Sequence, residues 1–125
     1  MIIDTDVVIW FLRGHERADD VIGELDHRVI SVVSYMELVR GARSTADLRQ
    51  IKGILAEAQF TTVPLSEKIG QRASLYLERY YLGSGIGLTD ALIAATAAET
   101  REVLCTGNRK HYQCIPGLEL KVFRP

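Results

Sequence analysis

The chain has 125 residues, 47% hydrophobic and 25% charged, and its 15 basic and 16 acidic side chains leave a formal net charge of −1. This composition is that of one globular domain and excludes a disordered chain or a disulfide scaffold. The longest apolar stretches, such as residues 7–12 and 91–98, fall well short of the roughly 18 residues of a bilayer-spanning helix, so no membrane segment is expected.

Hydrophobic periodicity predicts strands that alternate with helices. Short apolar or β-branched runs indicate the strands, and apolar residues three or four apart indicate the helices. Pro64 places its strand toward an edge of the sheet or lies near the end of that strand. In chain order we expect a strand at 1–3, helices at 5–14 and 16–25, a strand at 29–33, helices at 34–41 and 46–58, a strand at 60–65, helices at 66–82 and 89–98, and strands at 103–106 and 118–123, with loops at 84–87 and 107–117.

Capping signals set several of these boundaries. Thr5 or Asp6 can cap the first helix, and Ser34 with Glu37 has the spacing of a capping box, which predicts a helix start at Ser34. The β-branched strand at 29–33 should be buried on both faces. The alternation as a whole predicts a single domain, an α/β sandwich with a mostly parallel sheet.

Three acidic residues share one structural setting. Asp4 ends the first strand, Glu37 lies just past the second, and Asp90 begins a late helix. Sites in parallel α/β sheets gather at the carboxyl ends of the strands, so Asp4 and Glu37 should meet. Neighbouring carboxylates repel unless a cation relieves them, and Mg²⁺ or Mn²⁺ is suited to oxygen ligands and to phosphodiester cleavage. Helix capping explains each acid singly, but it does not explain the set.

The near-neutral charge does not indicate a general affinity for nucleic acid, so phosphate binding must be local. Two candidate RNA-binding patches are Arg40, Arg43, Arg49 and Lys52, and Arg109, Lys110 and His111, although both can equally be ordinary solvated surfaces. Neither cysteine and none of the three histidines has metal-ligand spacing, and we expect the histidines to be surface or loop residues. The first residues lack the basic start of a signal peptide, and we expect a cytoplasmic protein.

Four blocks of the sequence resemble the motifs of PIN domains. They are Ile2-Ile3-Asp4-Thr5-Asp6-Val7-Val8, Ser34-Tyr35-Met36-Glu37-Leu38-Val39-Arg40-Gly41-Ala42, Thr89-Asp90-Ala91-Leu92-Ile93-Ala94-Ala95-Thr96-Ala97, and Thr106-Gly107-Asn108 followed by Lys110-His111-Tyr112. The resemblance runs through the whole chain in the right order, and a free-standing domain of this size is similar to the toxin of a VapBC-type toxin–antitoxin pair.

The resemblance implies a PIN-like three-layer α/β/α sandwich with about five strands in one domain, 1–125. It implies a Mg²⁺- or Mn²⁺-dependent endoribonuclease that cuts RNA and stops translation, forms a homodimer and is neutralised by a cognate antitoxin lying across the active-site groove. Asp4, Glu37 and Asp90 correspond to the catalytic and metal-binding acids. Thr5 and Asp6 correspond to positions that orient the first acid, and Thr106 to a hydroxyl near the metal.

The fourth block departs from the family pattern. Many relatives carry an acid where this chain has Asn108, so we expect one firmly bound ion, and a second could arrive with the substrate phosphate. Asn108 can still ligate through its amide oxygen or orient a water.

Two other functions compete with the nuclease. Residues 4–8 also resemble the nucleophile motif of haloacid-dehalogenase-type phosphatases, in which Asp4 would attack and Asp6 would act as acid and base. Those enzymes need a later lysine and a paired-acid motif on a larger chain. The other alternative is a catalytically idle PIN-like module that binds RNA or protein, against which the intact acid trio counts.

Overall fold

The computed structural model describes all residues, Met1–Pro125. Its five-stranded sheet has the order β3-β2-β1-β4-β5, and every neighbouring pair is parallel. The strands are β1 (Ile2–Ile3), β2 (Arg28–Ser31), β3 (Phe60–Val63), β4 (Leu104–Thr106) and β5 (Leu120–Val122). The predicted parallel sheet of about five strands is therefore confirmed, and β3, which precedes Pro64, forms one edge as expected.

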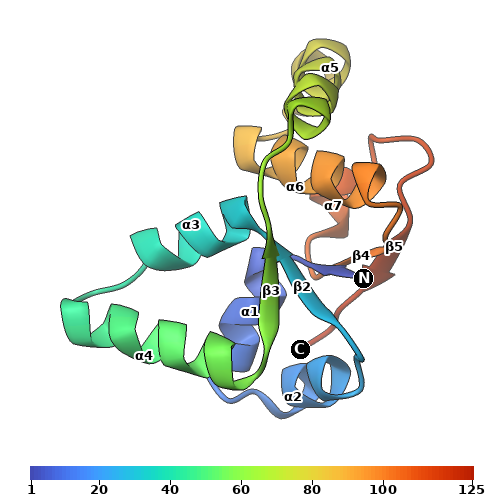
Figure 1. The fold of residues 1–125 in the computed structure, drawn as a ribbon. Helices are drawn as coiled ribbons and strands as arrows, with labels where there is room; N and C mark the ends of the chain where they lie inside the picture. Colours follow the sequence, from blue (N-terminus) through green and yellow to red (C-terminus); the bar gives the residue numbers. More distant parts are fainter.

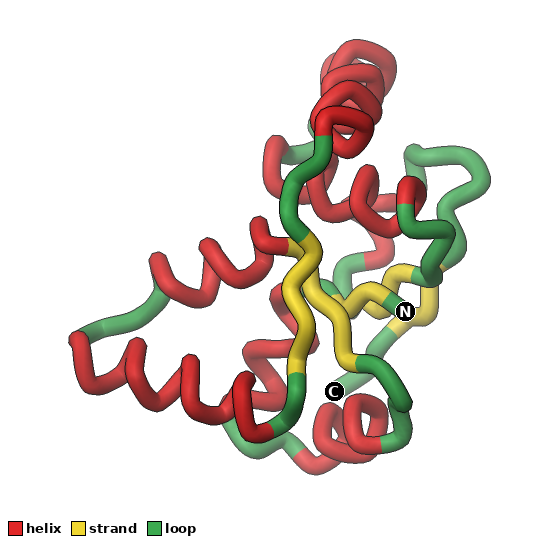
Figure 2. Tube along the Cα trace, in the orientation of Figure 1, coloured by secondary structure: helices red, strands yellow, loops and turns green.

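Helices cover both faces of the sheet, which confirms the three-layer α/β/α sandwich (Figure 1). Figure 2 shows the strands in the middle layer and α5 standing farthest from the sheet. None of the helices has the length and apolar character needed to cross a membrane. The helices are α1 (Thr5–Leu12), α2 (Glu16–Gly23), α3 (Val32–Arg40), α4 (Thr45–Glu57), α5 (Glu67–Ser84), α6 (Leu88–Glu99) and α7 (Arg109–Tyr112).

The two-residue strand β1 shows how the sequence divides the core. Adjacent side chains of a strand point to opposite faces of the sheet. Ile2 accordingly packs in one cluster with residues of α5, α6 and α7, whereas Ile3 packs in a second cluster with residues of α1 and α2. Both side chains are fully buried, so β1 is central and leaves its carboxyl end between the two layers.

Two predicted caps were wrong. The third helix begins at Val32, not Ser34, and its N-cap is Ser31, whose hydroxyl accepts a hydrogen bond from the Val33 amide at 3.1 Å. Burial of Val33 in the core outweighs the low helix propensity of a β-branched residue. The first helix is capped by Asp4 rather than by Thr5 or Asp6. The predicted loop 107–117 also contains one turn of helix, α7.

Arg28 ties two helix ends to the amino end of β2. Its guanidinium donates to the carbonyls of Ile22 and Gly23 at the end of α2 and, at 2.8 Å, to the carbonyl of Ala58 at the end of α4. Carbonyls at a helix C-terminus lack partners within the helix and carry partial negative charge, so a cation stabilises them. The C-termini of α2 and α4 are therefore both fixed at the amino end of β2.

Replacing Arg28 with methionine keeps most of the apolar stem but removes these charged donors. We expect Arg28→Met to lower the free energy of unfolding by ~1.5–3 kcal/mol, the range for hydrogen bonds to charged groups, as measured by urea denaturation. Arg49→Met on exposed α4 is the matched control and should change it by less than about 0.5 kcal/mol. Equal effects of the two substitutions would contradict this role of Arg28.

Candidate active site

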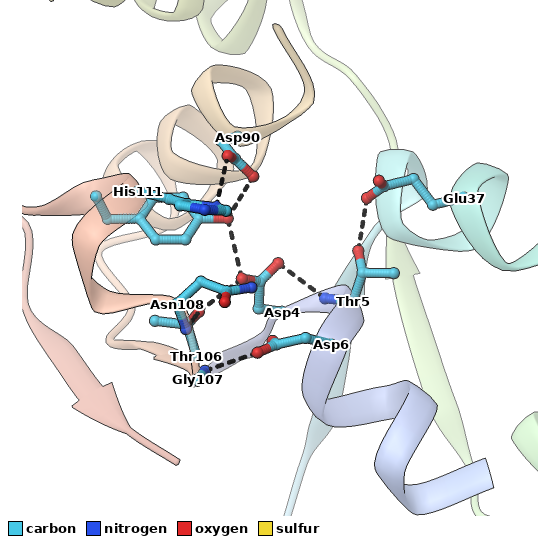
Figure 3. A network of polar contacts seen from close by, with 10 residues as sticks. Asp4, Thr5, Asp6, Glu37, Asp90, Thr106, Gly107, Asn108 and His111 are labelled. Atoms are coloured by element: carbon cyan, nitrogen blue, oxygen red, sulfur yellow. Dashed lines mark hydrogen bonds and ion pairs between the residues drawn. The ribbon is translucent and has the colours of Figure 1, made fainter. Parts of the chain in front are cut away.

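The acidic residues gather at the carboxyl ends of β1 and β4, beside the start of α6. Asp4 follows β1 directly, Thr106 ends β4, and Asp90 lies in the first turn of α6. The Asp4 amide donates to the carbonyl of Cys105 at 2.8 Å, which fixes the two strand ends side by side. Figure 3 shows Asp4 in the middle of a polar network that extends to Asp90 and, through Thr5, to Glu37.

Asp4 is the most buried acid of this network, with 4% of its surface exposed. One carboxylate oxygen accepts from the Thr5 amide at 2.8 Å. The other accepts from the Thr106 hydroxyl at 2.7 Å and lies 3.0 Å from the Tyr112 hydroxyl. Three donors from three different elements therefore hold one carboxylate in a single orientation.

Burial is the largest influence on the charge of Asp4. Loss of water raises the pKa of Asp4 to about 6; the Thr106 hydrogen bond opposes this, and the nearby Asp6 charge adds to it. None of the ion pairs in the structure includes Asp4, so its charge has no cationic partner. Burial also raises the pKa of Asp6, against the hydrogen bond from the Gly107 amide.

Tyr112 connects the two aspartates. Its fully buried hydroxyl lies 3.0 Å from Asp4 and 3.1 Å from Asp90. Burial, together with the charges of Asp4 and Asp90, raises the pKa of Tyr112, so the hydroxyl keeps its proton. The ring of the adjacent His111 places Nδ1 at 3.1 Å from the other oxygen of Asp90. Both oxygens of Asp90 therefore have polar neighbours from α7.

Glu37 reaches the network only through Thr5. The Thr5 hydroxyl lies 2.7 Å from the Glu37 carboxylate and 2.9 Å from the Ser34 hydroxyl, while the Thr5 amide donates to Asp4. Glu37 thus comes to the predicted end of the sheet but does not touch Asp4, and no hydrogen bond joins it to the Ser34 amide as a capping box would. Thr5 is the link between the two acids.

Asp6 and Asn108 shape the β4–α7 connection. The Gly107 amide donates to Asp6 at 2.9 Å, and the Asn108 amide donates to the Thr106 hydroxyl at 2.9 Å. A Cβ atom on Gly107 would lie 2.6 Å from the Asp6 carboxylate, so any other residue would push Asp6 aside. All four supporting residues, Thr5, Asp6, Thr106 and Asn108, lie beside the acids, as expected from their positions in the sequence.

The donor chemistry of this site fits a hard divalent cation. Carboxylate, amide and hydroxyl oxygens surround a buried negative charge that lacks a cationic partner. As the side chains stand, no three acidic, histidine or cysteine side chains lie close enough together to hold an ion. Asp4 and Asp90 are joined through one hydroxyl, that of Tyr112. An ion held by few protein ligands would complete its shell with water, as Mg²⁺ commonly does.

Two residues of this site were missing from the predicted set of site residues. Tyr112 and His111 lie on the short helix α7, which was expected to be loop. His111 is exposed as predicted, but it contacts Asp90. The only sequence signal was the place of both residues in the fourth motif block, since a four-residue helix has too little periodicity to be detected.

Two hollows flank the network. One, of about 620 Å³, lies between α1, α3 and α4 and includes Ile9, Leu12, Glu37 and Arg43; we call it the helical groove. The other, of about 440 Å³, lies beside the β4–α7 connection and includes Arg109 and Lys110. Arg43 from one predicted RNA-binding patch therefore lies on the opposite side of the acids from Arg109 and Lys110 of the other.

In an open parallel α/β sheet, ligands bind outside the carboxyl ends of the strands, which is where these acids lie. Residues 1–114 match the family of PIN domains. The chain therefore belongs to the PIN domain family.

Solved structures give the same fold. A toxin–antitoxin complex from Klebsiella pneumoniae is 27% identical, covering 94% of this chain and 93% of that chain with a TM-score of 0.76. VapBC2 from Rickettsia felis, bound to a promoter DNA fragment, is 21% identical with 98% of each chain covered and a TM-score of 0.81. VapBC-1 from nontypeable Haemophilus influenzae is 24% identical, covering 97% and 96%, with a TM-score of 0.81. No curated protein matches the chain significantly by sequence.

The raised pKa of Asp4 predicts a pH-dependent stability. Between the ordinary value of 3.8 and the folded value of about 6, the folded state binds the proton more tightly than the unfolded chain. The cost of the buried charge therefore grows as the pH rises through this window and is complete above it. One pKa unit corresponds to 1.36 kcal/mol. The free energy of unfolding of Asp4→Asn, relative to that of the native protein, should therefore rise by about 1 kcal/mol between about pH 5 and about pH 7.5.

Urea denaturation in EDTA at both pH values measures this difference. Asp20→Asn, which neutralises an exposed carboxylate on α2, is the matched control and should show no such growth. An Asp4→Asn effect of the same size at both pH values would rule out the buried charge as its cause.

Proposed function

We propose that this chain is a metal-dependent endoribonuclease, the toxic component of a toxin–antitoxin pair, which cleaves RNA in the cytoplasm and thereby inhibits translation. The observation that carries this proposal is the buried, unpaired charge of Asp4 beside Asp90 at the carboxyl edge of a parallel sheet. Membership in the PIN domain family and the likeness to toxin–antitoxin complexes support it.

Asp4, Asp90 and Glu37 are the residues we assign to catalysis and to holding Mg²⁺ or Mn²⁺. When bound, the ion would supply Lewis-acid activation of water and neutralise charge on the scissile phosphate. Asp4 provides the fixed negative charge, because three donors orient it and its surroundings exclude water. Asp90 and Glu37 are more exposed and can turn toward an ion next to Asp4.

The supporting residues orient the acids. Thr5 holds Glu37 and caps one oxygen of Asp4, and Thr106 fixes the other oxygen. Asp6 anchors the β4–α7 connection through the Gly107 amide. Asn108 adds a neutral amide at this rim, so the site has no fourth carboxylate there, and we propose that one ion binds firmly without RNA.

Purified protein free of antitoxin should cut a mixed RNA substrate in Mg²⁺ or Mn²⁺, and EDTA should abolish the cutting. Asp4→Asn and Asp90→Asn keep the size of each side chain but remove a charge, so each should reduce cleavage at least about 100-fold, the scale of losing an electrostatic group at a reacting centre. Gel electrophoresis of end-labelled RNA measures the rates, and Asp20→Asn is the matched control.

The two alternative functions predict different results for the same purified protein. RNA binding without metal-dependent cleavage would favour the idle binding module. An aspartyl phosphate (an acyl phosphate) trapped on Asp4 after incubation with a phosphomonoester, with release of its alcohol, would favour the phosphatase instead. Cleavage that persists in Asp4→Asn would contradict the assigned site.

We also propose a homodimer and a cognate antitoxin as partners. The helical groove mixes apolar side chains, such as Ile9 and Ile54, with charges of both signs, which suits a folded peptide segment. Leu82, 95% exposed, and Leu75, 45% exposed, leave an apolar face on α5 that supports self-association. Trp10 and Phe11, next to Ile9 in the sequence, pack against the core and are not part of the groove lining.

Ile9→Arg should weaken the antitoxin complex without unfolding the protein, because Ile9 is 36% exposed and lies in the helical groove. Leu65→Arg, on an exposed leucine outside both hollows, is the matched control. Size-exclusion chromatography with light scattering reports the homodimer when the protein is alone and the complex when an antitoxin is present. Equal loss of the complex in both variants would place the antitoxin elsewhere.

A further inference from the structure

The hollow beside the β4–α7 connection, which we call the basic hollow, differs from the helical groove in its charge. Arg109, Lys110, His111 and Arg124 are among its lining residues, and no acidic residue is. The helical groove, in contrast, includes the acids Glu37 and Asp47 beside its arginines. On a chain with a net charge of −1, this local excess of cations is confined to one side of the active site.

Apart from His111, which contacts Asp90, the basic residues of the basic hollow make no ion pair within the protein. Arg109, Lys110 and Arg124 are exposed, and none of the ion pairs in the structure includes them. Two other arginines show the contrast, since Arg28 binds three backbone carbonyls and Arg72 pairs with Glu99. Unpaired cations around a hollow of about 440 Å³ leave their donors free for an anionic ligand.

Hydrogen bonds join the rim of the basic hollow to the acids. The Asn108 amide donates to Thr106 at 2.9 Å, and Thr106 donates to Asp4 at 2.7 Å. On the other side His111 contacts Asp90 at 3.1 Å (Figure 3). A phosphate chain with one group beside Asp4 and Asp90 would therefore continue directly into the hollow.

We propose that the basic hollow binds the phosphate backbone of the RNA strand next to the bond that is cut. This inference rests on the proposed ribonuclease function and extends it to the path of the substrate. The hollow includes no Phe, Tyr or Trp and only one hydrophobic residue, Val122, so its lining favours charged contacts to phosphates over the stacking of bases. Contacts to phosphates position a strand without selecting its sequence.

The proposal assigns RNA binding to one of the two predicted patches and not to the other. Arg109 and Lys110 lie in the basic hollow and contact the strand, and Arg124, which the sequence did not single out, joins them. Arg43 lies in the helical groove with Glu37 and Asp47, where a phosphate would meet two carboxylates. The strand therefore leaves the acids over α7 and not over α3.

The salt dependence of RNA binding tests this path. The probe is a short fluorescein-labelled single-stranded RNA of mixed sequence, titrated with the protein in EDTA so that no cleavage occurs, with fluorescence anisotropy recorded over a series of KCl concentrations. The variant combines Arg109→Gln, Lys110→Gln and Arg124→Gln. Because each phosphate contact on a single strand contributes about 0.7 to the slope of log K against log salt, the slope should become shallower by about 2.

The matched control removes the same charge on the opposite side, with Arg40→Gln, Arg43→Gln and Arg49→Gln in one variant. Its slope should stay close to that of the native protein. Equal losses in the two triple variants would show an effect of net charge alone and would overturn the proposal. An unchanged slope in the basic-hollow variant, or no RNA binding by the native protein, would overturn it as well.

Two further measurements separate the possible failures. Thermal unfolding shows whether the triple variant folds, and the single variant Lys110→Gln, which changes one exposed side chain, should still lower the slope by about 0.7. Cleavage by the native protein in Mg²⁺ or Mn²⁺ is measured in parallel. Cleavage with an unchanged slope refutes the basic hollow alone, whereas binding with the predicted slope and no cleavage refutes the nuclease alone.

Discussion

The charge of Asp4, buried at the carboxyl end of the central strand, is the interaction on which the site depends. An isolated carboxylate without water is unfavourable, so its surroundings must supply donors or a cation. The structure supplies the Thr5 amide, the Thr106 hydroxyl and the Tyr112 hydroxyl. They come from α1, β4 and α7, and the positions of these elements are therefore coupled to one another through a single side chain. The buried charge of Asp4 lowers the stability of the fold, but it keeps a negative charge at the carboxyl end of β1, where we place the active site.

The surroundings of the acids are asymmetric. On one side the helical groove combines apolar and charged side chains between α1, α3 and α4, and on the other the basic hollow presents unpaired cations over α7. A protein segment and a nucleic acid need different surfaces, apolar contact for the first and positive charge for the second. One small domain can thus offer each ligand its own approach, with the acids lying where the two approaches meet.

The sequence was sufficient for the features that depend on long patterns. Alternating strands and helices predicted the parallel sheet, and Asp4 and Asp90 could be placed because each follows or begins an unmistakable apolar run. The sequence was insufficient for features that depend on a single hydrogen bond. Ser31 rather than Ser34 caps α3, since the Ser34 hydroxyl instead meets Thr5 from another element. Tyr112 approaches Asp4 from 108 positions away, and no local pattern records such a contact.

The close approach of Gly107 to Asp6 has a consequence for how such a sequence can change over time. A side chain at position 107 would occupy the space of the Asp6 carboxylate, and without that carboxylate the Gly107 amide loses its partner. A replacement of Gly107 therefore requires Asp6 to move or to change as well, so we expect the two positions to covary among descendants of this chain although 101 positions separate them.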